Sequence, residues 1–390
     1  MYEVIHGRQH VFYSPNKVVF GPETARTLLS EIQKRNRKRP LIVTDPGITQ
    51  TDFFGLLKED LKTAGTPYSI YDQVEPEPGA RLVAAGTEQL KSEECDIVIG
   101  IGGGSSLDVA KGVSIMATNA GRVLDMSGID MVERKGAPMI LMPTTAGTGS
   151  EVSNVTVLTD EETNTKKVVY SFYMLPDVAI VDPLLTLTMP AKLTAETGID
   201  ALVHAIEAYV SMNASPFSDL LAERAIRLIA KYLPVAWAKG SNIEARHFTS
   251  LAASLAGMAF CSGGLGGVHA LAYPLGTEYH MAHGRSNAVM LPHVMRYNVP
   301  GNPNRYAQIA AFMGKSVGGV HPVEAATLAV KAVEELLETL QVSYRLRDYG
   351  ITEKDIPKLV NGGMKQSRLF GFNPRDLEEE DVELIYQQAY

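Results

Sequence analysis

The stretch DIVIGIGGGSSLDVAK, residues 96–111, decides the fold class of this chain. Its first six residues read as a buried β-strand, and three consecutive glycines follow them directly. A helical pattern begins at the two serines after the glycines, so the stretch predicts a strand, a tight turn and a helix in succession. This succession is the unit from which parallel sheets with helical crossovers are built. We therefore expect an α/β fold around it.

Strand and helix patterns alternate on both sides of this stretch through the first half of the chain. Strands are expected at residues 41–44, 68–71 and 138–142, and helices at 22–36, 52–64, 79–92 and 105–118. A further β-rich segment covers 167–182, and after Pro190 the periodicity is helical almost to the end. The pattern predicts an α/β N-terminal domain at residues 1–187 and an all-helical C-terminal domain at 188–390. The active site is expected in the cleft between them, beyond the carboxyl ends of the strands.

Composition and charge restrict the partners of the protein. The 390 residues carry a net charge of −8, which argues against nucleic acid as a partner because phosphate binding needs a basic surface. No apolar run approaches the ~18 residues of a membrane-spanning helix, and residues 1–10 are too polar for a signal peptide. The only two cysteines, Cys95 and Cys261, suggest no disulfide framework. We expect a cytoplasmic protein that acts on a small molecule, without a nucleic-acid or membrane partner.

The glycine turn of the opening stretch has the form of a phosphate cradle. Gly103 and Gly104 let the backbone approach an anion closely, and free N–H groups at the start of the following helix point towards it. Ser105 adds a hydroxyl that can cap the helix or donate to phosphate. The alternative is an ordinary capped turn between a strand and a helix. The turn lacks the G-x-G-x-x-G fingerprint, so a standard Rossmann domain is not predicted.

A second polar loop, PTTAGTGSE at residues 143–151, also follows a predicted strand. Thr144, Thr145 and Thr148 offer hydroxyl and backbone donors, although a solvated Ser/Thr loop would look the same. Two such loops at neighbouring strand ends support each other as parts of one nucleotide site.

Asp45 follows the predicted strand at 41–44. A carboxylate at this point can accept a hydrogen bond from an adenosine ribose and repel a 2′-phosphate, which favours NAD over NADP. The alternative is a turn residue before Pro46, since aspartate is common in turns.

Asp200 and His204 lie four residues apart in an amphipathic helical pattern at 194–211, so they are neighbours on the helix surface. Glu207 falls on the same strip. A carboxylate and an imidazole at this spacing form half of a metal site, although an isolated pair is more often a surface pair or a core histidine.

The second half of the candidate metal site follows a glycine cluster. His269 comes directly after it, and His280 and His283 lie a short distance beyond. One aspartate and three histidines suit Fe²⁺, Zn²⁺ or Mn²⁺. By spacing alone, His280 and His283 compete for the last position, with His293 as a further alternative.

Five segments resemble a known family: GGGSSLDVAK (102–111), PTTAGTGSEV (143–152), GIDALVHAIEAY (198–209), GGVHALAYPLG (266–276) and HGRSNAVMLPHVMRYN (283–298). The sequence resembles the iron-containing alcohol dehydrogenase family, which includes lactaldehyde and 1,3-propanediol reductases. The segments occur in the order of the family over most of the chain, and together they are highly specific.

The resemblance implies a dehydroquinate synthase-like fold, in which a dinucleotide-binding domain and a helical domain enclose a metal. It also implies metal ligands at Asp200, His204, His269 and His283, which decides against His280. For NAD(H), the matching positions are Asp45, Gly103, Gly104, Ser105, Thr144, Thr145, Thr148 and Lys167. Phe260 matches an aromatic residue that lines the substrate pocket.

The chain departs from the family pattern near the expected site. Tyr273 stands where several relatives have a second histidine, so Tyr273 or His280 is expected to relay a proton to solvent. Arg285 stands where small or apolar residues are frequent, and Arg368 lies in a loop that holds an aspartate in many relatives. These cations suggest a short aldehyde with an anionic tail, such as sulfoacetaldehyde, although both could be solvated surface residues.

The reaction that the resemblance implies is the interconversion of a small primary alcohol and its aldehyde with NAD(H). The metal, iron with zinc and manganese as alternatives, acts as a Lewis acid, and the nicotinamide takes or gives the hydride. We also expect a homo-oligomer. Alternative functions are polyol oxidation as in glycerol dehydrogenases, a dehydroquinate synthase-like lyase reaction and, outside enzymes, nucleotide sensing with a structural metal.

Overall fold

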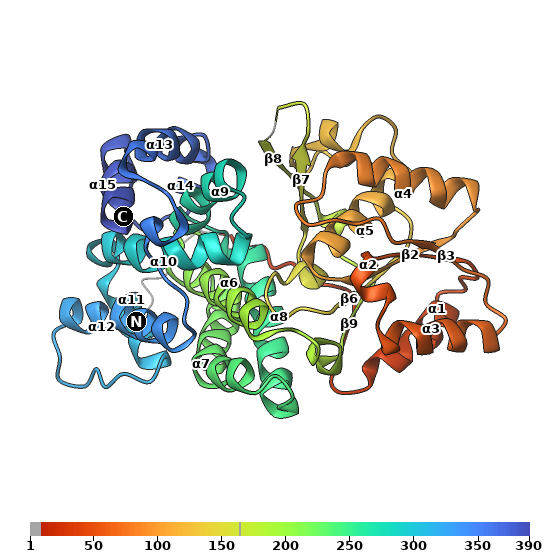
Figure 1. Ribbon diagram of the computed structural model, residues 1–390, viewed down its shortest axis with the longest axis horizontal. Helices are drawn as coiled ribbons and strands as arrows, with labels where there is room; N and C mark the ends of the chain where they lie inside the picture. Colours follow the sequence, from red (N-terminus) through yellow and green to blue (C-terminus); the bar gives the residue numbers. More distant parts are fainter. Residues whose placement is uncertain (1–8, 164) are drawn as a thin grey trace.

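The computed structural model describes residues 9–163 and 165–390. A sheet with helices on both faces fills the N-terminal half, and helices pack beside it in the C-terminal half (Figure 1). The predicted combination of a parallel-sheet domain with a helical domain is confirmed.

The main sheet has six strands in the order β1-β9-β6-β4-β2-β3. The strands are β1 (Val18–Phe20), β2 (Pro40–Val43), β3 (Ser69–Tyr71), β4 (Ile97–Gly102), β6 (Met139–Pro143) and β9 (Val178–Val181). All five pairings are parallel, and Gly102 at the end of β4 lies beside Pro143 at the end of β6. The two predicted polar loops therefore leave the sheet side by side.

Helices cover both faces of this sheet because alternate residues of each strand point to opposite sides. The helices are α1 (Leu28–Lys34), α2 (Pro46–Thr49), α3 (Asp52–Thr63), α4 (Ala80–Ser92) and α5 (Gly104–Met116). In β4, Ile97 and Ile99 pack in the apolar cluster that contains α1 and α3 residues, whereas Val98 packs with residues of α4 and α5. A strand buried on both faces explains the uninterrupted apolar run of the opening stretch.

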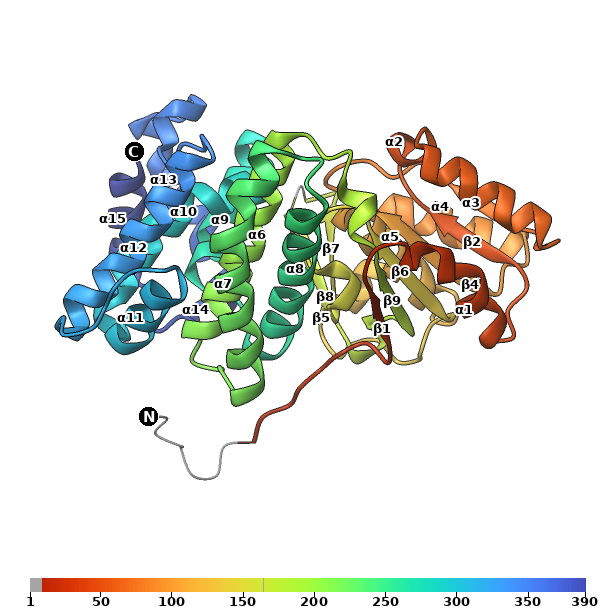
Figure 2. The same ribbon diagram turned by 90° about the horizontal axis from the view of Figure 1, so that it is seen from below.

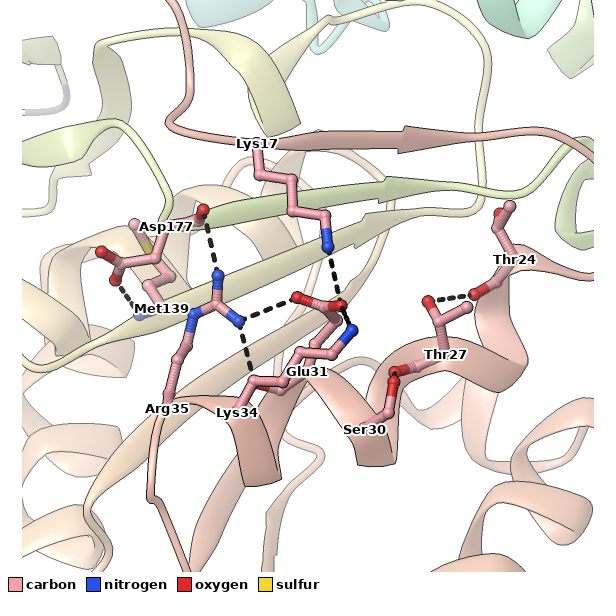
Figure 3. Close-up of polar contacts among 9 residues, drawn as sticks. All are labelled: Lys17, Thr24, Thr27, Ser30, Glu31, Lys34, Arg35, Met139 and Asp177. Atoms are coloured by element: carbon pink, nitrogen blue, oxygen red, sulfur yellow. Dashed lines mark hydrogen bonds and ion pairs between the residues drawn. The ribbon is translucent and has the colours of Figure 1, made fainter.

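A polar cluster at α1 fixes this helix to the sheet edge (Figure 3). The buried Glu31 carboxylate accepts hydrogen bonds from Lys17 Nζ and Lys34 Nζ, both at 2.8 Å, and from Arg35 at 2.9 Å. Burial alone would raise the pKa of Glu31, but the three hydrogen bonds outweigh it and lower the pKa to about 2. Glu31 therefore stays ionised at physiological pH.

The sequence patterns missed or merged several strands. The β-rich segment 167–182 contains two strands in different sheets, β8 (Thr165–Tyr170) and β9. A small sheet combines β8 with β5 (Gly128–Ile129) and β7 (Val155–Asp160), which was not predicted. Edge strand β1 was also not predicted, because three residues carry too little periodicity. The β7–β8 pair is antiparallel and lies at the cleft side of α5.

The helical half contains no strand among its described residues. Its helices are α6 (Ala191–Val210), α7 (Pro216–Ala238), α8 (Ile243–Gly263), α9 (Gly267–Tyr279), α10 (His283–Asn298), α11 (Pro303–Phe312), α12 (Pro322–Thr339), α13 (Ile356–Met364), α14 (Ser367–Phe370) and α15 (Glu379–Ala389). The predicted division at residues 187/188 falls between β9 and α6 and stays a prediction.

Two further features concern the whole chain. Residues 9–17 run from the helical half to β1 (Figure 2), and the Tyr13 backbone N–H donates to Ser262 Oγ in α8 at 3.2 Å. Within the described residues no single helix is long and apolar enough to cross a membrane; α8 and α9 pass that test only as a pair bent by 108°.

Candidate metal and nucleotide site

Helix α6 supplies the first two groups of the metal cluster. It is packed against α7, α8 and α10, so it is buried nearly all round and its polar residues lie in the protein interior. Asp200 and His204 are 2% and 4% exposed and lie one turn apart. Buried polar groups of this kind need a partner, and here they face the cleft between the two halves.

His269 and His283 complete the cluster. His269 lies in the first turn of α9, and His283 is the first residue of α10. One ligand atom from each of the four residues lies within 4.8 Å of all the others. Ligands about 2.1 Å from a shared tetrahedral ion lie roughly 3.4 Å apart, so small side-chain adjustments suffice to bind one.

Asn287 shows that lone pairs converge at the centre of this cluster. Its Nδ2 donates to Asp200 Oδ1 at 2.6 Å and lies 3.2 Å from Nε2 of both His269 and His283. Its Oδ1 is buried without a hydrogen-bond partner. Three acceptor atoms aimed at one point suit a cation, so the residues present fit a divalent metal. Asn287 was not predicted, although its spacing of four from His283 on one helix could have indicated it.

The protonation states favour metal binding at neutral pH. Burial lowers the pKa of His204 to about 3, although Asp200 acts in the opposite direction. Burial also lowers the pKa of His283. Burial would raise the pKa of Asp200, but the adjacent histidines and the hydrogen bond from Asn287 outweigh it and lower the pKa. Asp200 therefore offers an anionic carboxylate, and His204 and His283 offer neutral imidazoles, the states in which these groups bind metals.

The predicted glycine turn lies at the opposite wall of the cleft. Gly102 has φ +148°, and a Cβ atom there would lie 2.5 Å from Ser106 Oγ. Gly104 begins α5, and a Cβ atom on it would lie 2.8 Å from Thr148 Cγ2. The turn therefore needs glycine for its conformation and for the close approach of the second loop.

The second loop packs against this turn as expected. Thr144 N–H donates to the Gly102 carbonyl at 2.9 Å. Thr145 lies beside Gly103, and Thr148 lines the cleft with Gly104 and Ser105.

Asp45 caps a helix, as its turn role predicts, and the ribose contact stays a prediction. Its Oδ1 caps α2 by accepting from the Gly47 and Ile48 N–H groups at 3.0 and 3.2 Å. Its Oδ2 accepts from Ser106 Oγ at 3.2 Å, which brings the carboxylate to the glycine turn. The turn function is therefore real, and the same side chain remains within reach of a bound nucleotide.

The cleft is lined by both halves of the molecule. The α/β half contributes Gly104, Ser105, Asp108, Thr148, Lys166 and Tyr170, and the helical half contributes Asp200, His204, Phe260, His269, Tyr273 and His283. Phe260 lies against His204 with ring centroids 4.6 Å apart, and Tyr273 lies over His283 at 5.9 Å. Asp108 and Tyr170 were not predicted: Asp108 lies within the segment 102–111 but was given no role in the cleft, and the neighbours of Tyr170 in sequence carry no motif.

Lys167, which was expected to contact the cofactor, does not line the cleft. Adjacent residues of β8 point to opposite faces, and it is Lys166 that lines the cleft, where it forms an ion pair with Glu77 and donates to Thr159 Oγ1 at 3.0 Å. Lys167 lines a different cavity, bounded by α4 and residues 119–124. The two neighbouring lysines therefore lie on opposite faces of the strand, and a cofactor contact by Lys167 stays a prediction.

Four other residues considered from the sequence do not line the cleft. His280 is an exposed residue that ends α9, and His293 is buried elsewhere, with Nε2 2.8 Å from the Tyr344 carbonyl. Arg285 is paired with Glu196 rather than facing a ligand. Arg368 is exposed at the cleft margin, where it donates to the Tyr170 hydroxyl at 3.0 Å.

Comparisons with known proteins agree with this geometry. Residues 15–183 match the family model described as iron-containing alcohol dehydrogenase, and residues 194–390 match the C-terminal model of the Fe-containing alcohol dehydrogenase family. The chain is 42% identical to a 1,3-propanediol dehydrogenase of Citrobacter freundii, over 98% of this chain and 99% of that protein. It is 36% identical to an NAD-dependent methanol dehydrogenase of Bacillus methanolicus, over 97% of this chain and 99% of that protein.

A solved structure extends the comparison to three dimensions. A crystal structure of 1,3-propanediol oxidoreductase superimposes with a TM-score of 0.96 at 41% identity, covering 98% of this chain and all of that one. The chain therefore belongs to the iron-containing alcohol dehydrogenase family and is an oxidoreductase of alcohols and aldehydes.

Proposed function

We propose that this enzyme interconverts a short primary alcohol and its aldehyde by metal-assisted hydride transfer to and from NAD(H). The observation that carries the proposal is the convergence of four ligand atoms within 4.8 Å of one another in the same cleft as the glycine turn of α5. A metal and a nicotinamide can both reach a small substrate there. The similarity to the 1,3-propanediol dehydrogenase supports a short alcohol or diol as substrate.

Asp200, His204, His269 and His283 would hold the metal, for which we propose iron; the ligand set also suits zinc or manganese. A bound metal supplies Lewis acidity that lowers the pKa of a hydroxyl or polarises a carbonyl. Phe260 covers one side of the cluster and excludes water. Burial raises the pKa of Tyr273, so its phenol keeps its proton and acts as a hydrogen-bond donor in the cleft.

For the cofactor, we propose that the N–H groups of Gly103, Gly104 and Ser105 bind the pyrophosphate at the start of α5. Thr144, Thr145 and Thr148 surround this position. Asp45 would accept from the adenosine ribose, which favours NAD over NADP. Lys166 takes the contact first expected of Lys167 because Lys166 lies in the cleft.

The substrate tail meets mainly neutral side chains. Phe260, Leu265, Ala272 and Tyr273 line the helical wall of the cleft, and the charge of Arg285 is neutralised by Glu196. The hypothesis of an anionic tail therefore rests on Arg368 alone, and we favour a neutral substrate.

We expect a higher kcat/KM for propanal than for sulfoacetaldehyde, and we expect the ratio of the two values to be unchanged in Arg368→Ala. A preference for sulfoacetaldehyde that Arg368→Ala removes would contradict the neutral tail.

A panel of alcohols and aldehydes with NAD and NADP, followed at the NADH absorbance band, tests the reaction. Metal content is measured on the same sample, with a chelator-treated sample as the control. We expect net NADH formation from a short alcohol, preferentially with NAD and only in the metal-containing sample. A lyase would give no net NADH, and a sensor with a closed structural metal site would give no turnover.

We also propose that the enzyme is a homo-oligomer. Val11, Phe12, Phe217 and Leu220 are apolar and exposed, and Phe12 stacks on Phe217 with ring centroids 5.4 Å apart, so they form one exposed surface that a second copy can cover. Light scattering after size-exclusion chromatography should give a multiple of 42.3 kDa. A monomer at micromolar concentration would contradict the proposal. The cytoplasmic location stays a prediction.

A further inference from the structure

Glu207 lies directly beside the metal cluster on the helix that supplies two of its ligands. It follows Asp200 by seven residues and His204 by three, so all three side chains lie along one side of α6. Glu207 is only 5% exposed, and it is not itself one of the four converging groups. A buried carboxylate needs hydrogen-bond donors, and both of its oxygens have one.

Both donors belong to the first turn of α9. Glu207 Oε2 lies 2.6 Å from Nδ1 of His269, and Oε1 accepts from the Val268 N–H group at 2.6 Å. The first N–H groups of a helix have no partner within the helix, and a carboxylate there is favoured by the helix dipole. The Glu207 carboxylate thus accepts from a free N–H group at the start of α9 and also contacts the proposed metal ligand His269 in the same turn.

These contacts determine which nitrogen of His269 carries the proton. An ionised carboxylate can only accept, so Nδ1 must be the N–H group that faces Glu207. Nε2 then keeps its lone pair, and it faces the Nδ2 donor of Asn287 at 3.2 Å on the cluster side. Two neighbours on opposite sides of the ring therefore require the same tautomer, which is the one that can bind a metal through Nε2.

The other two cluster histidines lack a carboxylate clamp of this kind among the described residues. Within that part of the chain, His204 has only the Gly147 backbone as a further hydrogen-bonding neighbour, and the contacts of His204 and His283 with Asp200 run through Nε2, the atom on the cluster side. The His283 side chain is also 37% exposed, whereas that of His269 is 1% exposed. His269 is therefore the ligand with the most fixed ring.

We propose that Glu207 is a positioning residue that fixes the tautomer and ring orientation of His269, so that Nε2 is preset to bind the metal. The inference rests on the proposed metal site, but the tautomer exists whether or not a metal is bound. Loss of such an outer carboxylate typically lowers metal affinity 10–100-fold. The same carboxylate contacts the Val268 N–H group and the His269 ring. The position of the His269 ring therefore depends on the position of the first turn of α9.

The tautomer is measured in the metal-free wild-type enzyme by ¹⁵N–¹H correlation of the imidazole rings, with His269→Asn to assign the signal. We expect the His269 proton on Nδ1 at neutral pH. A proton on Nε2 would overturn the proposal; His269→Asn serves only to assign the wild-type signal.

The affinity is measured by competition between the protein and a chelator for Zn²⁺. Glu207→Gln keeps the size of the side chain, but an amide has one acceptor and one donor position, so it cannot accept from both His269 and Val268. We expect its Zn²⁺ affinity to fall 10–100-fold. Glu196→Gln is the matched control, because Glu196 lies on the same helix and pairs with Arg285 outside the cluster; it should stay within about twofold of wild type.

Two results separate this inference from the proposed function. If wild type binds Zn²⁺ and shows the Nδ1–H tautomer but oxidises no alcohol, the proposed function fails and the role of Glu207 stands. If Glu207→Gln binds Zn²⁺ as tightly as wild type does, the positioning role fails, whatever the enzyme catalyses.

Discussion

His283 is the most exposed of the four proposed ligands, and it lies at the wall of the cleft away from the glycine turn. We expect His283→Ala to lose nearly all turnover, because three remaining groups hold a divalent ion less tightly. NAD binding should persist, since the proposed pyrophosphate contacts come from the start of α5. Steady-state kinetics and a fluorescence titration with NADH measure the two effects separately. Full activity in a metal-free sample of the variant would contradict the metal-assisted mechanism.

Lys166 and Lys167 form a matched pair of neighbouring residues on opposite faces of β8. We expect Lys166→Ala to raise the Kd for NADH about tenfold, which is about 1.4 kcal/mol and typical of a hydrogen bond to a charged group. Lys167→Ala should leave the Kd unchanged, because its side chain lines a different cavity. Fluorescence titration of both variants is the measurement. The opposite ranking would restore Lys167 as the cofactor contact.

His293 provides a pH-dependent contribution to stability that is separate from the metal cluster. Burial lowers its pKa from 6.5 to about 4, although the Tyr344 carbonyl opposes this. Between these values the unfolded chain binds more protons than the folded one, so the free energy of unfolding falls as the pH falls through the window. We expect the difference in the free energy of unfolding between wild type and His293→Gln to change by up to about 3 kcal/mol from pH 6.5 to pH 4. Urea unfolding of both proteins at several pH values measures this difference. A difference that does not depend on pH would contradict the lowered pKa of His293.

At the scale of the elements, the turn between β4 and α5 was the most predictable part of the site. A buried apolar run followed by three glycines leaves few other structures open, and the structure places the turn as expected. The lysine on β8 was less predictable, because an error of one residue in a strand exchanges its faces. The residues that line the two cavities show which face of β8 meets the cleft.

The fourth ligand of the metal cluster and the hydrogen bonds around the ligands depend on contacts between elements. The spacing of Asp200 and His204 predicts one half-site, because both lie on one helix. The choice between His280 and His283 depends on the path of the chain after α9, which periodicity does not describe. Spacing places Asn287 and Glu207 on the same helix faces as the ligands, but their hydrogen bonds arise from packing α10 and α9 against α6, which local sequence does not describe.

The turn also gives a prediction about backbone strain. Gly102 has φ +148° and no room for a Cβ atom, so Gly102→Ala should lower the free energy of unfolding by about 1–3 kcal/mol and weaken NADH binding. Gly55 in α3 is the control, because nothing lies within 4 Å of a Cβ atom there and Gly55→Ala should gain up to about 1 kcal/mol. Urea unfolding of both variants is the measurement. Equal stability of the two variants would contradict the strain.

At the scale of the whole molecule, each half has its own large apolar core. The sheet and its helices form two clusters and the helical half forms a third, while a small fourth cluster of Val152, Ala179 and Val181 has Met258 of α8 packed against it. The cleft between the halves therefore lies where polar groups from both can meet without either core being opened. The proposed nucleotide contacts accordingly come mainly from the α/β half, and the proposed metal ligands come only from the helical half.

Metal binding should consequently stabilise the helical half more than the sheet, because the four ligands belong to α6, α9 and α10. At a free metal concentration of 100 times Kd, the expected gain in the free energy of unfolding is about 2.7 kcal/mol. Hydrogen exchange with and without a chelator tests where this gain appears. We expect faster exchange in α6, α9 and α10 after metal removal, and unchanged exchange in β4 and β6. His283→Ala is the control, since it should show little difference between the two conditions. An equal change in β4 and β6 would mean that the metal stabilises the molecule as one unit, contrary to the separate cores.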